Sequence, residues 1–405
     1  MLGPLSRGVR VAVRSFRPKQ LRLIVRDLLP RCRPQQSDVK HVEEAIDWLC
    51  RAHDAAGRRG VAAGYYPSHG GWLDPYPETT GYIIPTFLHA ASTLERPDLV
   101  DRALAMGEWE IEEQLPDGAV RGGVGLSGPP IVFNTGQVML GWLALHSVTA
   151  EARFLEAAHR AGAWLRDVQD SDGAWRRHTH EGLPHAYHTR VAWPILATAD
   201  ATGDSNLRRA GQRHLEWVLE QAEEDGWIRH MGFTEKVPPL THTIAYTLRG
   251  AVESLPFLPE EVATPVLDLA ARASEALVAL VHEGQGRRVV LAGQLRRPWL
   301  PAARYGCVTG NAQLALAFIR LGSFRAIAGL ESAAGILIDD VCARQIPEGE
   351  VPEMRGAVPG SFPCWGAYNP LSFPNWATKF FADALLVRMD LGSLVEASAP
   401  AVVRG

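Results

Sequence analysis

Apolar residues recur every three to four positions along most of the chain, which is the spacing of α-helices. In residues 151–169, E-A-R-F-L-E-A-A-H-R-A-G-A-W-L-R-D-V-Q, charged residues occupy the other side, so we expect a helix that buries one face. Residues 137–145, Q-V-M-L-G-W-L-A-L, are nearly apolar all round, as in a helix surrounded by protein. The chain therefore alternates amphipathic helices with apolar ones.

A short motif repeats at the ends of the amphipathic helices. Trp164 is followed by a glutamine after five residues and by a turn glycine after nine, and Trp109 is followed by both at the same offsets. The equivalent positions lie 53 to 61 residues apart and are Trp48, Trp109, Trp164, Trp217, Leu277 and Leu337. The sixth copy is the most divergent and lacks the glycine at that offset. A regular period of this kind indicates repeated structural units.

Each repeat also contains a second, apolar helix. These helices begin near Thr79, Asn134, His188, His242, Thr309 and Asn375. An outer ring of amphipathic helices around an inner ring of apolar ones is the natural packing, so we predict an all-α fold, an (α/α)6 toroid of six helical hairpins. We expect a basic N-terminal extension at residues 1–36, the toroid at residues 37–392 and a C-terminal tail at residues 393–405.

In such a toroid all six inner helices begin at the same end, which we call the mouth. The loops that lead into the mouth are the long ones, at residues 54–77, 285–306 and 343–374. Long ordered loops over a rigid scaffold commonly carry binding and catalytic residues. We therefore expect the functional site at the mouth.

Polar side chains interrupt the apolar helices near the mouth. Helix capping explains Thr, Asn and Glu at helix starts, but not the His, Arg, Tyr, Gln and Lys residues one turn further in. Buried polar groups without partners are costly, so these residues predict a polar pocket. The candidate catalytic residues are Glu78, His188, Arg190, His242 and Tyr246. The candidate substrate-binding residues are Trp72, Asp74, Tyr82, Asn134, Gln137, Trp175, Arg177, Asn311, Gln313, Trp365, Asn375 and Lys379.

The starts of the inner helices resemble those of a known superfamily. The segments P-E-T-T-G-Y, F-N-T-G-Q, Y-H-T-R-V-A-W, H-T-I-A-Y-T-L-R-G, T-G-N-A-Q and F-P-N-W-A-T-K-F-F-A-D-A-L, spread over residues 40–390, carry this likeness. The superfamily is that of the (α/α)6 carbohydrate-active proteins, which includes six-hairpin glycoside hydrolases, unsaturated glucuronyl hydrolases and the toroid domains of polysaccharide lyases. More closely, the chain resembles uncharacterised single-toroid proteins encoded among bacterial polysaccharide-biosynthesis genes. The resemblance implies action on an acidic, uronate-containing oligosaccharide or polysaccharide.

Three functions remain open at this point, and elimination or C5-epimerisation is the leading one. Asn134 and Arg190 would neutralise the uronate carboxylate, and a His or Tyr would then remove the acidified proton. His242 and Tyr246 are four residues apart and share one helix face, which suits this role. The first alternative is a glycoside hydrolase with Glu78 as general acid, although hydrolysis needs a second carboxylate that the sequence supports poorly. The second alternative is a non-catalytic glycan-binding or assembly factor.

We expect no cofactor and no metal. Four histidines fall within residues 178–188, and Cys307 and Cys364 precede consecutive inner helices in a loose resemblance to the zinc site of lanthionine-cyclase toroids. Neither set has a recognised metal-binding spacing. The W-L-x3-Q-x3-G-x-W spacing also resembles the repeat of squalene–hopene cyclases, but the chain has no D-x-D-D motif.

The composition of the chain bears on its binding partners and on its cellular compartment. Hydrophobic residues make up 46% of the 405 residues and charged residues 21%, and the net charge of −4 gives no reason to expect nucleic acid. Five scattered cysteines without a C-x-x-C motif predict reduced thiols and a cytoplasmic setting. The first 34 residues carry nine Lys or Arg and one acid, Asp27. We interpret them as a solvated extension, or alternatively as a peripheral contact with anionic lipid at the inner membrane.

Overall fold

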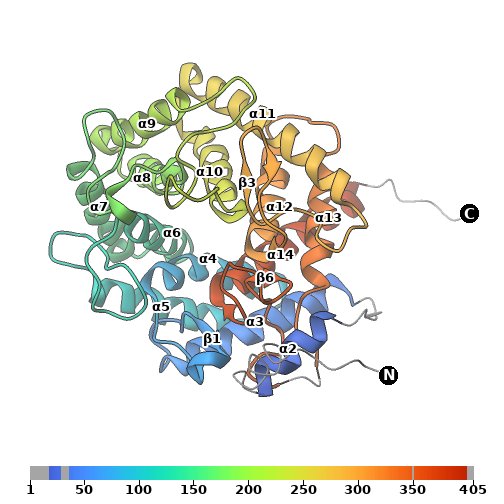
Figure 1. Cartoon of the computed structure of the whole chain (residues 1–405). Helices are drawn as coiled ribbons and strands as arrows, with labels where there is room; N and C mark the ends of the chain where they lie inside the picture. Colours follow the sequence, from blue (N-terminus) through green and yellow to red (C-terminus); the bar gives the residue numbers. More distant parts are fainter. Residues whose placement is uncertain (1–17, 29–35, 349–350, 399–405) are drawn as a thin grey trace, which may run out of the picture.

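The protein is a closed ring of helical hairpins, which confirms the predicted (α/α)6 toroid (Figure 1). The computed structural model describes residues 18–28, 36–348 and 351–398, with side chains described as far as residue 391. The outer helices are α3 (Asp38–Ala55), α5 (Asp98–Glu113), α7 (Ala152–Asp167), α9 (Ser205–Glu220), α11 (Glu260–Gly284) and α13 (Leu330–Cys342). The inner helices are α4 (Pro77–Thr93), α6 (Val132–Thr149), α8 (Thr189–Thr202), α10 (Thr241–Ser254), α12 (Val308–Gly322) and α14 (Asn375–Ser398).

Short strands and 3-10 turns occupy the loops between the helices. The strands β1 (Gly64–Tyr66), β2 (Gly71–Trp72) and β7 (Phe373–Pro374) form an antiparallel sheet in the order β2-β1-β7. Two further antiparallel pairs join β3 (Leu295–Arg296) to β4 (Leu300–Pro301), and β5 (Gly306–Cys307) to β6 (Ser361–Phe362). The 3-10 turns are η1 (Pro67–His69), η2 (His180–Gly182), η3 (Ala186–His188) and η4 (Leu255–Phe257). Because β1 pairs with β7, the first and last long loops meet at the mouth.

Glycines allow the inner helices to approach one another closely. A Cβ atom added at Gly81 of α4 would overlap the backbone of Val138 in α6, and one at Gly250 of α10 would overlap the backbone of Thr189 in α8. The threonine that precedes the glycine in the recurring T-G pattern has a separate task. The hydroxyls of Thr80 and Thr135 accept hydrogen bonds of 2.9 Å each from the backbone N–H groups of Val61 and Val120. The hydroxyl of Thr378, which precedes Lys379 instead of a glycine, accepts one of 3.2 Å from the N–H group of Val358, so three mouth loops are fastened to their helices.

A repeated glutamine ties the turn to the next outer helix in three of the repeats. Gln169 donates to the carbonyls of Gly173 and Ala210 at 2.9 Å each, so one side chain joins the turn after α7 to α9. Gln114 does the same for the turn after α5, through the carbonyls of Gly118 and Ala157 at 3.0 Å each. The W-x4-Q-x3-G motif is therefore a clamp between neighbouring hairpins.

The same clamp closes the ring, and here the structure corrects the sequence analysis. Gln345 donates to the carbonyls of Gly356 and His41 at 2.9 Å each, which links the last hairpin to α3. Gly356 has a positive φ, and a Cβ atom there would overlap the backbone of Glu44. The sixth repeat thus keeps both its glutamine and its glycine, but an inserted loop moves the glycine away from the expected offset.

Part of the basic N-terminal segment packs on the toroid as helix α2 (Pro18–Leu28). Leu23, Arg26 and Asp27 are buried there. The Arg26 guanidinium donates to the carbonyl of Arg344 at 2.6 Å, and the Asp27 carboxylate accepts from the Cys364 N–H at 2.7 Å. The remaining residues of the predicted extension, 1–17 and 29–35, and the tail from residue 399 lie outside the described residues. In the described part of the chain, no helix is both long and apolar enough to cross a membrane.

Two glycine substitutions test the packing of the inner ring. Gly81→Ala should destabilise the protein by about 1–3 kcal/mol, because the added methyl group overlaps the neighbouring helix. Gly335→Ala is the matched control: Gly335 lies inside α13, and a Cβ atom there meets nothing within 4 Å. Since alanine favours a helix over glycine, this variant should gain about 0.5–1 kcal/mol. Thermal unfolding midpoints measure both, and equal midpoints would contradict the close approach.

Candidate active site

The mouth opens into a cavity of about 730 Å³. Six of the predicted residues line it, from α4, α6, η3 and α10, and they are Glu78, Tyr82, Asn134, His188, His242 and Tyr246. Apart from Glu78, the described lining residues include no carboxyl group, and they include no lysine or arginine. The cavity is therefore walled by aromatic rings, amides and hydroxyls around a single acid.

Glu78 lies in the first turn of α4 and its carboxyl group accepts a hydrogen bond from the hydroxyl of Tyr76. Burial raises the pKa of Glu78 to about 7, although the Tyr76 hydrogen bond and the charge of Arg190 act in the opposite direction. Near neutral pH the carboxyl group is thus present in both its protonated and its ionised form. A group with this property can donate a proton and later accept one.

His242 and Tyr246 form a close pair in the cavity, as their spacing on one helix face predicts. Their ring centroids are 4.4 Å apart. Nδ1 of His242 lies 3.0 Å from the amide oxygen of Gln313, so this nitrogen carries the proton and donates. Burial lowers the pKa of His242 to about 3, while burial and the neighbouring Glu78 raise the pKa of Tyr246. Both rings are therefore neutral at physiological pH.

The histidine-rich segment serves the structure of the wall. His185 stacks on Tyr187 with ring centroids 4.5 Å apart, and its two ring nitrogens lie 3.0 and 3.2 Å from the carbonyls of Gly232 and His180. His188 packs edge-on against Trp175, and burial lowers its pKa well below the ordinary value. Across the residues that the structure describes, no three His, Cys, Asp or Glu side chains come together in a way that could hold a metal ion.

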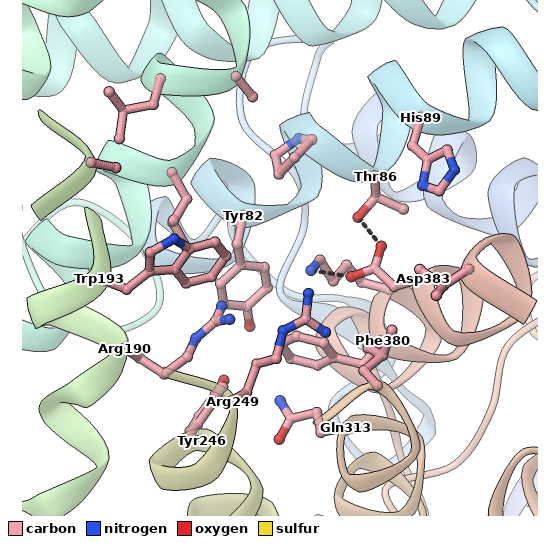
Figure 2. Close-up of a pocket in the computed structure, with 18 residues that line it drawn as sticks. Tyr82, Thr86, His89, Arg190, Trp193, Tyr246, Arg249, Gln313, Phe380 and Asp383 are labelled. Carbon is pink, nitrogen blue, oxygen red and sulfur yellow. Dashed lines mark hydrogen bonds and ion pairs between the residues drawn. The ribbon is translucent and has the colours of Figure 1, made fainter. Parts of the chain in front are cut away.

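Three predicted residues face away from the mouth, which corrects the expectation that they share one pocket with the rest. Arg190, Gln313 and Lys379 line a second cavity of about 340 Å³ towards the other ends of the inner helices (Figure 2). Tyr82 and Tyr246 line both cavities and form the floor between them. Arg190 donates through Nε and Nη2 to the amide oxygen of Gln137, at 3.1 and 2.9 Å, so Gln137 holds the arginine. Gln137 itself is fully buried and lines neither cavity.

Other predicted binding residues have structural roles outside the cavity. The Asn375 amide donates to the carbonyl of Ala62 and the hydroxyl of Thr79 at 2.9 and 2.8 Å, and the Asn311 amide donates to Asp340 at 3.0 Å. Their amides are used to connect segments of the scaffold. The remaining candidates that do not line the cavity are Trp72, Asp74, Trp175, Arg177 and Trp365.

These five residues differ in their surroundings. Trp175 is fully buried and its indole N–H donates to the carbonyl of Leu165 at 2.8 Å, so it belongs to the core. Trp72 packs against the rings of Trp48 and Tyr65. Asp74, Arg177 and Trp365 are exposed on loops. The tryptophans among the candidate binding residues therefore lie outside the cavity, two of them packed in the protein and Trp365 exposed.

The cavity is also lined by residues outside the set of candidate catalytic and binding residues. Tyr76, Phe133, Tyr187, Tyr368 and Trp376 supply ring faces and hydroxyls, and the glycine-rich loop at residues 122–131 forms one side. Four of the five aromatic residues lie within two positions of a selected residue. The residues next to each inner-helix start would therefore have predicted the lining of the cavity better, since most of the additional lining residues lie beside a candidate residue.

Comparisons with known proteins identify the fold. No protein-family model and no curated protein sequence matches the chain. Among solved structures, the unsaturated glucuronyl hydrolase of Bacillus sp. GL1, described as responsible for the degradation of glycosaminoglycan, is similar, with a TM-score of 0.68 and 16% identity over 88% of this chain and 97% of that one. The chain has the fold of the unsaturated glucuronyl hydrolases.

Two further hydrolase structures agree. One that is specific for heparin has a TM-score of 0.66 and 12% identity over 88% of this chain and 98% of that one. The enzyme of Streptococcus agalactiae has a TM-score of 0.63 and 12% identity over 90% and 95% of the two chains. At these identities the likeness establishes the architecture, while the chemistry has to be argued from the residues of the cavity.

Replacing Glu78 tests its environment through the pH dependence of stability. Its pKa is raised from 4.5 to about 7 in the folded state, so the folded protein binds the proton more tightly. The associated stability is present below pH 4.5 and is lost as the pH rises through 7, to a total of about 3 kcal/mol. The stability of Glu78→Gln should therefore rise relative to the wild type between pH 5 and pH 8, as measured by thermal unfolding. Glu331→Gln, on the exposed start of α13, should show no such trend, and a parallel trend in both variants would contradict the assignment.

Proposed function

We propose that the protein is a carbohydrate-active enzyme that cleaves a terminal unsaturated uronate from an acidic oligosaccharide, with Glu78 as its acid and base. The observation that carries the proposal is that the described residues of the mouth cavity include one carboxyl group, that of Glu78, whose pKa burial raises to about 7. Hydrolysis of an ordinary glycoside uses two carboxyl groups. A reaction that needs only one proton-transferring group fits this cavity better.

Hydration of a 4,5-unsaturated uronate is such a reaction, because its C4=C5 bond next to the ring oxygen is an enol ether. Protonated Glu78 would donate its proton to C4, which leaves positive charge shared by C5 and the ring oxygen. Water would then add at C5 and return a proton to the Glu78 carboxylate. The hemiketal so formed opens to a C5 ketone and a hemiacetal at C1, and the hemiacetal releases the adjoining sugar. One water is consumed, and the acid is regenerated.

The walls of the cavity suit a sugar ring. Phe133, Tyr187 and Trp376 line it with flat apolar faces, and sugar rings bind such faces through their C–H groups. The amide of Asn369 is available as a neutral hydrogen-bond donor, because its oxygen already accepts from the hydroxyl of Tyr66 at 2.9 Å, which turns its N–H2 group to other partners. The Asn134 amide lines the same cavity but already donates to the carbonyl of Arg121 at 3.3 Å. The names of the similar structures support a uronate as the sugar, because they describe unsaturated glucuronyl hydrolases.

Elimination or C5-epimerisation is the second candidate, and the close His242–Tyr246 pair in the cavity favours it. Two features weigh against it. Removal of a proton next to a uronate needs a strong base and a cation on the carboxylate, whereas His242 has a pKa of about 3 and the pKa of Tyr246 is raised. Arg190, the expected cation, faces the cavity behind the floor.

We also propose, from the sequence resemblance, a role among polysaccharide-biosynthesis proteins and a cytoplasmic location. The four described cysteines are free, in keeping with a reducing compartment. A peripheral membrane contact would involve the basic N-terminal segment, of which α2 exposes Arg22, Val25 and Leu28.

An activity assay separates these functions. Unsaturated uronyl disaccharides should lose their ultraviolet chromophore with the wild type, and Glu78→Gln should lower kcat by about 10²-fold or more. Tyr246→Phe, which keeps the ring that packs in the floor, should retain most of the activity. A new chromophore from saturated polymer would instead show elimination, and solvent deuterium at C5 without cleavage would show epimerisation. Binding without any turnover would support a glycan-binding factor and overturn the proposal.

The pH dependence of kcat/KM gives an independent test. Because Glu78 must be protonated to donate, kcat/KM should fall as the pH rises through about 7. Tyr76→Phe removes a hydrogen bond that lowers the pKa of Glu78, so the fall should move to higher pH. Tyr305→Phe, a tyrosine that does not line the cavity, should leave the profile in place. An unchanged profile in Tyr76→Phe would argue that a different group limits the reaction.

A further inference from the structure

A second chamber lies behind the floor of the mouth cavity and has chemistry of its own. It is lined by side chains of all six inner helices, and its volume of about 340 Å³ is within the range of small-ligand sites. Figure 2 shows Arg190, Tyr246, Arg249 and Gln313 converging on a common space beneath Tyr82 and Trp193. We call this space the rear chamber. The connections between helices at this end of the toroid are short, so the polar groups of the rear chamber come from the inner helices themselves.

Basic groups outnumber acidic ones around the rear chamber. Among the described residues, Arg190, Arg249 and Lys379 line it, against one lining carboxylate, Asp383. The Lys379 ammonium lies 2.5 Å from Asp383, which also accepts a hydrogen bond of 2.6 Å from Thr86. Lys379 is therefore already paired. Arg249 pairs with Glu253 at 2.5 Å, but Glu253 also pairs with Arg320 at 3.0 Å, so its charge is shared.

Arg190 is the cation without a counter-charge. It is 3% exposed, and no carboxylate of the described residues lies within ion-pair distance. Three aromatic rings surround its guanidinium carbon, those of Trp193, Tyr246 and Phe380, at 5.2, 5.5 and 5.9 Å from their centroids. These contacts offset only part of the cost of burying a charge. Nη1 makes no hydrogen bond with the described residues, so a donor remains for an incoming acceptor.

The positive charges of Arg190 and Lys379 are not explained by an interaction with the carboxyl ends of the inner helices. Basic residues do stabilise the carboxyl ends of helices, and the inner helices end on this side. That explanation fits a residue in the last turn. Arg190 is the second residue of α8, and Lys379 lies in the first turns of α14, so both are far from those ends.

Gln313 supplies a second, independent indication of a ligand. It is 3% exposed and lines the rear chamber, and its oxygen faces His242 on the mouth side at 3.0 Å. Its amide nitrogen has no hydrogen-bond acceptor among the described residues, although it lies near enough to the Tyr246 hydroxyl to lower the pKa of Tyr246. A buried amide donor whose one contact is the Tyr246 hydroxyl, next to a guanidinium without a carboxylate partner, favours the binding of an acceptor there.

We propose that the rear chamber is a second binding site, distinct from the mouth, for a small oxyanion carried on a sugar-sized ring. A carboxylate or a phosphate monoester would receive hydrogen bonds from Arg190, Arg249 and Gln313, since a guanidinium matches the geometry of both anions. The exposed edge of Trp193 and the ring of Phe380 would cover the ring of the ligand.

Calorimetric titration at fixed ionic strength tests the proposal with four probes: glucuronate, glucose 1-phosphate, inorganic phosphate and glucose. At least one charged sugar should bind with one-to-one stoichiometry, and glucose should bind about tenfold or more weakly, which corresponds to the loss of one charged hydrogen bond. Glucuronate and glucose 1-phosphate as separate titrations distinguish a carboxylate from a phosphate ligand. Binding of inorganic phosphate as tight as that of either sugar would overturn the need for a ring.

Four variants locate the site. Arg249→Gln removes a lining cation, and Ala197→Trp fills the chamber from α8, so each should weaken binding of the charged sugar about tenfold or more. Arg325→Gln removes an exposed arginine that pairs with Asp268 at 2.6 Å outside both cavities and should leave binding unchanged, as should Glu78→Gln in the mouth. Thermal unfolding confirms that each variant is folded. If no charged probe binds, if Ala197→Trp binds normally or if Glu78→Gln abolishes binding, the rear chamber is not the site.

Discussion

Closure of the ring is the constraint on which the remaining structure depends. Six hairpins form a toroid only if the last one packs against the first, and the clamp of Gln345 on His41 and Gly356 makes that junction. Closure forces all inner helices to begin at one end, because every hairpin enters the ring in the same sense. The mouth, the floor and the rear chamber are therefore products of one geometric requirement. The glycines of the inner ring permit the approach that this requirement demands.

The division of the axis into two chambers separates opposite electrostatic environments. On the mouth side Glu78 lies among neutral groups, so burial keeps part of it protonated. Behind the floor, Arg190 and its basic neighbours lie a short distance away, yet Tyr82 and Tyr246 stand between them and the mouth. A catalytic acid directly paired with Arg190 would be held ionised. The tyrosine floor lets the same ring hold an acid that is partly protonated near neutral pH on one side and a cation without a carboxylate partner on the other.

The sequence predicted the fold well because the scaffold is repeated six times. Features that several repeats share, such as Gln169 with Gly173 and the threonine of the T-G pattern, turned out to hold the scaffold together. Residues that occur in only one repeat form the candidate active site, and Glu78 is the clearest example. Side-chain direction was beyond sequence reasoning: His188 and Arg190 are two residues apart but face different chambers, and Asn311 points outward to Asp340 while Gln313 points inward. A helix turns about 100° per residue, so small errors of phase reverse such assignments.

The seam between the last hairpin and α3 is made of hydrogen bonds and packing, with the same glutamine clamp as the junctions at Gln114 and Gln169. The arrangement of hairpins around the ring does not depend on which junction holds the two ends of the chain. The observed order of hairpins along the sequence is then one of six circular permutations of the same fold. A permuted chain, with its ends at another junction, would keep both chambers on the axis of the ring.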